Sequence, residues 1–166
     1  MQGFAQWLQA TQLSVAIQSS EWLIPLLQSI HILTIGVVFV SSSIVMLRVL
    51  GRMRTDEAFD AVWSRFAPWT RYGVVVMTLT GVVLIVGEPE RELGAISFWV
   101  KLALLAVAIV GTLRLGHALK AAPAAPFSNA AKIGAAALIV LWIAIIFFGR
   151  AIAYDTEVWG ALAQQA

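Results

Sequence analysis

The sequence predicts an all-α fold, namely a bundle of four transmembrane helices preceded by a short amphipathic helix at the membrane interface. Hydrophobic residues make up 60% of the 166 residues and charged residues only 12%, whereas soluble domains carry about 25% charged residues. The mean hydropathy is +0.86. Four apolar stretches each exceed the roughly 20 residues that cross a bilayer. The loops are too short to hold a second core, so residues 1–166 are expected to form a single membrane domain.

Residues 1–20 are expected to form the interfacial helix. Phe4, Trp7, Thr11, Val15 and Gln18 follow one another at three- or four-residue steps, which is the spacing of one helix face. Such a helix lies in the plane of the interface with its apolar side toward the lipid. A frayed terminus is the alternative interpretation.

Four spans follow, with expected boundaries at residues 22–50, 68–87, 96–119 and 128–154. Pro68 is placed near the first helical position of the second span, where a missing backbone N–H costs the helix nothing. The same span is expected to stop at Gly87, which Glu88 and Pro89 follow.

Small residues on three of the spans favour close packing of the helices. They are Gly73 and Gly81 on the second span, Gly111 and Gly116 on the third, and Ala130, Gly134 and Ala137 on the fourth. A four-helix bundle with short connections accommodates all of these contacts.

The distribution of basic residues predicts the orientation in the membrane. The first and third connections with their flanks are basic, because they hold Arg48, Arg52, Arg54, Arg65, Arg71, Arg114, Lys120 and Lys132. The second connection has only Arg91, and the first twenty residues have no Lys or Arg. The positive-inside rule therefore places both termini on the outer side. Arg48 and Arg114 are expected to reach the headgroups at the inner boundary.

His31 is the most informative polar residue, because an ionisable side chain inside a span is costly and usually functional. At about 1.5 Å per residue it lies roughly 13 Å below the outer surface, and Met77 lies at about 15 Å. Lys101 is only about 7 Å deep, and Arg150 is also near the outer end. His117 lies near the inner end, too far below His31 for both to bind one iron.

These positions leave two interpretations open. In the first, His31 is the axial ligand of a haem b, Met77 is a candidate second ligand, and Lys101 and Arg150 meet the propionates. In the second, every residue has an ordinary role. His31 then bonds a hydroxyl, with Ser29, Thr34, Thr78 and Thr80 as the partners on offer. Met77 fills the core, Lys101 and Arg150 extend to the interface, and His117 is an interfacial residue.

Short segments along nearly the whole chain carry a resemblance to a known family. They are Trp7–Thr11, Leu13–Ile17, Ile30–Leu33, Arg48–Gly51, Pro68–Trp69, Phe98–Leu102 and Gly149–Tyr154. In this order they resemble the DUF6644-type family of small bacterial four-helix integral membrane proteins. The resemblance implies the fold, the bacterial inner membrane as location, and His31, Lys101 and Arg150 as signature positions. It implies no activity.

The chain is also loosely similar to four-helix b-type cytochromes and to copper-resistance membrane proteins, but it lacks the characteristic residues of both classes. Two histidines are too few for a di-haem cytochrome, and the four methionines are scattered. The absence of cysteine excludes disulfides, thiolate metal sites and c-type haem attachment. No phosphate-binding loop or catalytic triad is present, and a net charge of +2 gives no nucleic-acid footprint.

Three hypotheses for the function remain. The first is a haem b protein with one haem per subunit near the outer face, bound by His31 and serving electron transfer or redox sensing. The second is a cofactor-free membrane scaffold or partner subunit. The third is a copper-handling protein of the outer leaflet. The lipid bilayer, a homo-oligomer and a redox partner protein are the expected partners.

Overall fold

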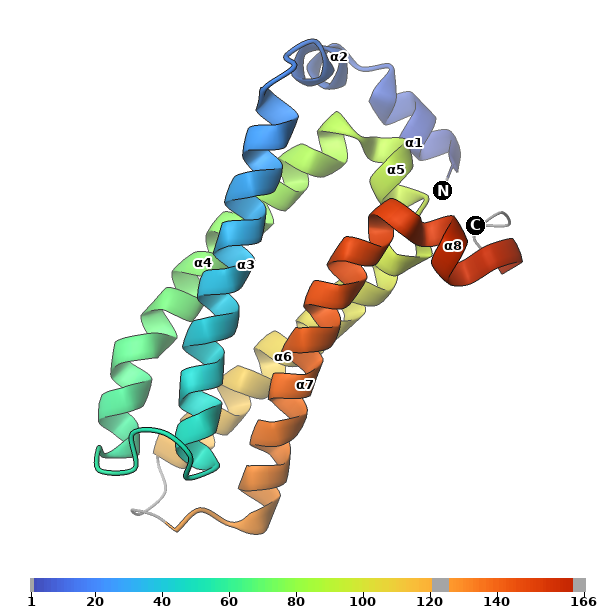
Figure 1. The fold of residues 1–166 in the computed structure, drawn as a ribbon. Coiled ribbons are helices and arrows are strands. Elements are labelled where there is room, and N and C mark those ends of the chain that lie inside the picture. The colour runs from blue at the N-terminus through green and yellow to red at the C-terminus, as the bar shows by residue number, and fades with distance from the viewer. Residues whose placement is uncertain (1, 121–125, 163–166) are drawn as a thin grey trace.

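The computed structural model describes residues 2–120 and 126–162 and consists of long helices running up and down beside one another (Figure 1). The long helices are α3 (Leu23–Val49), α4 (Phe59–Gly87), α6 (Ile96–Lys120) and α7 (Asn129–Ala151). Each is long and apolar enough to cross a membrane, and the described residues contain no strand. The predicted all-α bundle of four spans is therefore confirmed.

Short helices gather at one end of the bundle, which we call the outer end. They are α1 (Gln2–Gln9), α2 (Gln12–Gln18), α5 (Pro89–Leu93) and α8 (Asp155–Trp159), with the 3-10 turns η1 (Ile152–Tyr154) and η2 (Gly160–Leu162) flanking α8. The first and last elements of the chain thus lie at the same end (Figure 1). The loop of residues 50–58 and the start of α7 lie at the other, inner end.

The segment expected to form one interfacial helix forms two. Thr11 interrupts it, because its side-chain oxygen accepts a hydrogen bond from the backbone N–H of Ser14 (3.3 Å) and caps α2. Phe4 and Trp7 stack on each other at 5.6 Å, and their exposed fractions are 56% and 62%. The apolar stripe therefore faces away from the protein, as contact with a membrane surface requires.

Helix α4 begins at Phe59, so the predicted start at Pro68 is wrong. Pro68 lies inside the helix and removes one of its backbone hydrogen bonds. The helix extends to Phe59 because Phe59, Val62 and Trp63 form a buried stripe at helical spacing. Burial of that stripe outweighs the local signal of the proline. The predicted end at Gly87 is confirmed, and α5 follows with Pro89 at its first position.

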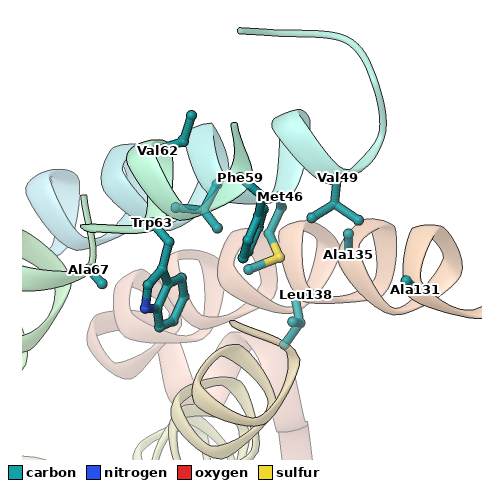
Figure 2. Packing of buried hydrophobic residues seen from close by; sticks show 10 residues of the cluster. Met46, Val49, Phe59, Val62, Trp63, Ala67, Ala131, Ala135 and Leu138 are labelled. Atoms are coloured by element: carbon teal, nitrogen blue, oxygen red, sulfur yellow. The ribbon is translucent and has the colours of Figure 1, made fainter. Parts of the chain in front are cut away.

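The stripe of α4 is part of the core at the inner end. It packs against α3 and α7 through Val45, Met46, Val49, Ala131, Ala135 and Leu138 (Figure 2). A second buried cluster in the middle of the bundle joins α3, α6 and α7 through Val38, Ala108, Trp142 and Ile145. These two layers hold the four spans together and leave the outer half of α3 and α4 beyond them.

The glycines of α4 and α6 lie at close contacts between helices, as predicted. A Cβ at Gly111 would lie 2.8 Å from a methyl carbon of Leu138. Gly73 leaves room for Val38 in the same way, and Gly116 leaves room for the ring of Trp63.

The small-residue stripe predicted for the fourth span is displaced by one position. Ala131 and Ala135 are buried, whereas Ala130 and Ala137 are exposed and no heavy atom lies within 4 Å of a Cβ placed at Gly134. The sequence shows the spacing of such a stripe, but which of two adjacent stripes faces the bundle depends on tertiary packing.

Arg48 does not reach the headgroups as expected but is 7% exposed. Its Nε and Nη2 both donate to the backbone carbonyl oxygen of Glu57, at 2.9 and 2.7 Å. Its guanidinium lies 5.5 Å from the ring centroid of Phe127. The carboxylate of Glu57 binds Arg54 and Arg65. Arg48 therefore fastens the loop of residues 50–58 under the inner core. Arg114 is exposed, in keeping with its predicted place.

Candidate functional site around His31

His31 lies on α3 two turns toward the outer end from Val38 and on the same side of the helix. Its ring is half-buried and faces α4. The Nδ1 atom is 2.8 Å from the hydroxyl oxygen of Thr80. Gly81 gives the ring its space, because a Cβ there would lie 3.4 Å from Cε1 of His31. The contact therefore joins the first two spans in the outer half of the bundle.

The hydroxyl of Thr80 lies within hydrogen-bond distance of both His31 and its own helix. The Thr80 hydroxyl donates to the backbone carbonyl of Val76 (2.9 Å), and the carbonyl of Met77 is also near, at 3.2 Å. When the single proton of this hydroxyl goes to a carbonyl of its own helix, its oxygen accepts a hydrogen bond from Nδ1–H of His31. The lone pair of the imidazole then resides on Nε2, the atom available to bind a metal or accept another hydrogen bond.

The other hydroxyls proposed as partners of His31 bind their own helices. Ser29, Thr34 and Thr78 each donate to the carbonyl four residues earlier, at 2.7 to 2.8 Å. The Thr80 hydroxyl also bonds its own helix, but its oxygen additionally lies 2.8 Å from Nδ1 of His31. Sequence alone could not choose among the four, because the choice depends on how α3 and α4 face each other.

Met77 lies one turn before Thr80 and Gly81 on α4. It is therefore within about one helical turn, or 5.4 Å, of the level of His31. Its side chain is 4% exposed. The thioether is thus enclosed by packing, which suits a core residue better than an open ligand.

Lys101 is half-buried in the first turns of α6. Its stem passes Gly149 of α7, where a Cβ would lie 3.5 Å from Cδ of Lys101. Its ammonium group is 5.7 Å from the ring centroid of Phe98. The positive charge of Lys101 acts on both His31 and Glu92. Lys101 therefore supplies a cation near the outer half of the bundle.

Glu92 of α5 is half-buried. Burial raises the pKa of this carboxyl above its usual value of 4.5, and the positive charges of Lys101 and Arg91 offset only part of that rise. The sequence signal for this short helix is Pro89 at its first position.

Arg150 lies apart from this group. It is exposed, its Nη2 donates to the hydroxyl of Tyr154 (3.0 Å), and its guanidinium stacks 5.0 Å from the same ring. His117 lies near the inner end of α6, is exposed, and has its ring 6.0 Å from that of Trp63. The structure thus brings His31 and Met77 to one level with the charge of Lys101 nearby, and keeps Arg150 and His117 outside the group.

The described residues hold no group of three or more His, Asp or Glu side chains that could bind a metal ion. Comparison with protein-family models, with curated proteins and with solved structures finds no match to this chain. The resemblance to the DUF6644 type therefore stays a prediction, and the functional inference depends on the site itself.

Proposed function

We propose that this chain is an integral membrane protein that binds one haem b per subunit near the outer face, with Nε2 of His31 as the axial ligand. Its role would be electron transfer or redox sensing. The observation that carries the proposal is the His31–Thr80 hydrogen bond. Metal-binding histidines characteristically donate their other N–H to a fixed acceptor, which sets the tautomer and the ring orientation. Thr80 would be this acceptor for His31.

The residues of the site fit a haem in part. His31 would supply a half-buried imidazole, and Lys101 would supply a cation for a propionate. Arg150 would serve the second propionate only after leaving Tyr154. Met77 does not fit the role of second ligand, because its thioether is enclosed. When bound, haem supplies one-electron chemistry, and the protein contributes ligation, burial and charge.

Space favours an oligomer for this function. Cofactor sites measure about 300–1,000 Å³, and four thin helices leave little room for such a volume between them. A haem would therefore lie on the half-exposed side of the His31 ring, where a second subunit would cover it. We propose a homo-oligomer in the bacterial inner membrane, with both termini on the outer side and a redox partner protein.

Absorbance spectra of the detergent-purified protein, recorded with and without dithionite, test the proposal. We expect a Soret band that shifts on reduction, persists in His117→Ala and disappears in His31→Ala. His117→Ala is the matched control because it removes the chain's other histidine at an exposed position. A colourless wild-type protein, expressed with haem in excess, would contradict the proposal.

A cofactor-free scaffold or partner subunit is the second candidate, and the same hydrogen bond favours it. Thr80 already satisfies Nδ1 of His31 without any cofactor, and polar links between spans stabilise membrane bundles by about 0.6 kcal/mol on average. Under this hypothesis His31→Ala and Thr80→Val both weaken the fold and change no spectrum. The copper hypothesis gains no support from the described residues, and copper found by elemental analysis without a Soret band would favour it.

A further inference from the structure

We propose that one water molecule is bound inside the inner half of the bundle and links α6 to α3 and α4 through Thr112, Ser42 and Thr70. These three side chains line a cavity of about 10 Å³, together with Val45, Trp63, Ala67, Arg71 and Leu113. Ser42 is eleven residues from His31 toward the inner end of α3, so this site is separate from the one proposed for the cofactor.

Thr112 carries the inference because its hydroxyl is buried without a partner. The residue is 4% exposed, and its Oγ1 makes no hydrogen bond within the part of the chain that the structure describes. A buried hydroxyl without a partner destabilises the folded state. Thr34 and Thr78 avoid this cost by donating to the carbonyl four residues earlier. Thr112 does not, and it lines the cavity instead.

The two hydroxyls across the cavity are also incompletely satisfied. Ser42 Oγ and Thr70 Oγ1 are 3.4 Å apart, which is a long contact for two hydroxyls. Ser42 is 1% exposed and therefore has no access to outside water. The three hydroxyl-bearing residues all line the cavity, and buried waters typically make about three hydrogen bonds.

The volume of this cavity fits a water molecule and is too small for larger occupants. A cavity must offer roughly 10–15 Å³ to hold a water molecule, and this one is at that limit. A chloride ion is larger than water, and the positively charged residue Arg71 among the lining residues opposes a cation. The water would give α6 a polar contact with both helices of the first hairpin, one turn above the contact of Gly116 with Trp63.

Three single variants of the full chain test the proposal by the sign of their effect. Thr112→Val keeps the shape and removes the hydroxyl, Thr112→Ser keeps a hydroxyl, and Thr78→Val is the control on a lipid-exposed position. If water is bound, Thr112→Val lowers the thermal unfolding midpoint by a few degrees relative to Thr112→Ser and to the Thr78→Val control. If the cavity is dry, removing an unpartnered hydroxyl leaves the midpoint unchanged or raises it, which would overturn the proposal.

A high-resolution structure of the wild-type protein gives a second measurement that does not depend on the variants folding. Density for a water within hydrogen-bond distance of Thr112 Oγ1 is expected. An empty cavity, or Thr112 bonded to its own helix, would overturn the proposal. The haem proposal is unaffected by either result, because the spectra of His31→Ala test it independently.

Discussion

Trp63 and Gly116 show how much of the packing depends on single residues. The indole is 7% exposed and lies directly against the Cα of Gly116, where a side chain would collide with the ring. A Cβ placed at Gly134 on α7 would meet no heavy atom within 4 Å. The two glycines have the same intrinsic helix propensity. A difference between alanine substitutions at the two sites would therefore report the difference in packing around them.

We expect Gly116→Ala to lower the free energy of unfolding by about 1–3 kcal/mol, because the added methyl group forces Trp63 or the helix to move. Gly134→Ala, the control, should raise it by up to about 1 kcal/mol through helix propensity alone. Unfolding by a denaturing detergent titrated into mild micelles measures both. Equal effects of the two variants would contradict the packing at Gly116.

Glu92 predicts a pH dependence. Its pKa is raised in the folded protein above 4.5, its usual value in an unfolded chain. Between these two pKa values the folded state binds more protons, so the free energy of unfolding falls as the pH rises through that window. Glu92→Gln has no ionisable carboxyl at this position, so its free energy of unfolding does not fall in this way.

The Glu92→Gln variant should therefore be more stable than the wild type at neutral pH, and the two should converge below about pH 4.5. Unfolding midpoints measured from pH 4 to 8 test this, with Glu90→Gln on an exposed position of the same helix as the control. A stability difference that does not change with pH would show that burial of the charge is not its cause.

At the scale of elements, the start of α6 is fixed by a residue far along the chain. The carboxylate of Asp155 accepts hydrogen bonds from the backbone N–H groups of Ile96 (3.0 Å) and Ser97 (2.9 Å). Trp159 donates to the hydroxyl of Ser97 at 2.9 Å. The carboxylate thus satisfies N–H groups that have no partner within the helix, and it ties α8 to the outer end of α6.

Asp155→Ala should cost about 0.5–2 kcal/mol of stability, as the loss of a helix cap does. The effect should be local, so the amides of Ile96 and Ser97 should exchange hydrogen faster in the variant. Glu157→Ala, which removes an exposed carboxylate from the same short helix, is the control. Unchanged exchange at Ile96 in Asp155→Ala would contradict the cap.

At the scale of the whole molecule, the first and last elements share one end, and the basic loop of residues 50–58 lies at the other (Figure 1). The positive-inside rule predicts that this loop lies in the cytoplasm. The chain has no cysteine, so single cysteines introduced at exposed positions report which side each end faces.

We expect a membrane-impermeant maleimide added to spheroplasts to label Ser19→Cys and not Arg52→Cys. Both positions are exposed, Ser19 at the end of α2 and Arg52 in the inner loop. Labelling of both after permeabilisation is the control for reactivity. The opposite pattern would reverse the proposed orientation.

The sequence by itself determined the number of spans and most of their ends. Apolar length fixes the spans because a bilayer offers no other partner for backbone groups, and α3, α6 and α7 begin and end within a few residues of the expected positions. It also singled out His31, because an ionisable residue stands out in an apolar run.

Only the tertiary structure decided which faces meet. It extended α4 through Pro68, buried Arg48, and chose Thr80 from four hydroxyls as the partner of His31. Each of these outcomes depends on a neighbour distant in sequence: the inner core for α4, the carbonyl of Glu57 for Arg48, and the register of α3 against α4 for His31. Periodicity gives the faces of a helix but not the rotation of that helix against its partners, which packing alone sets.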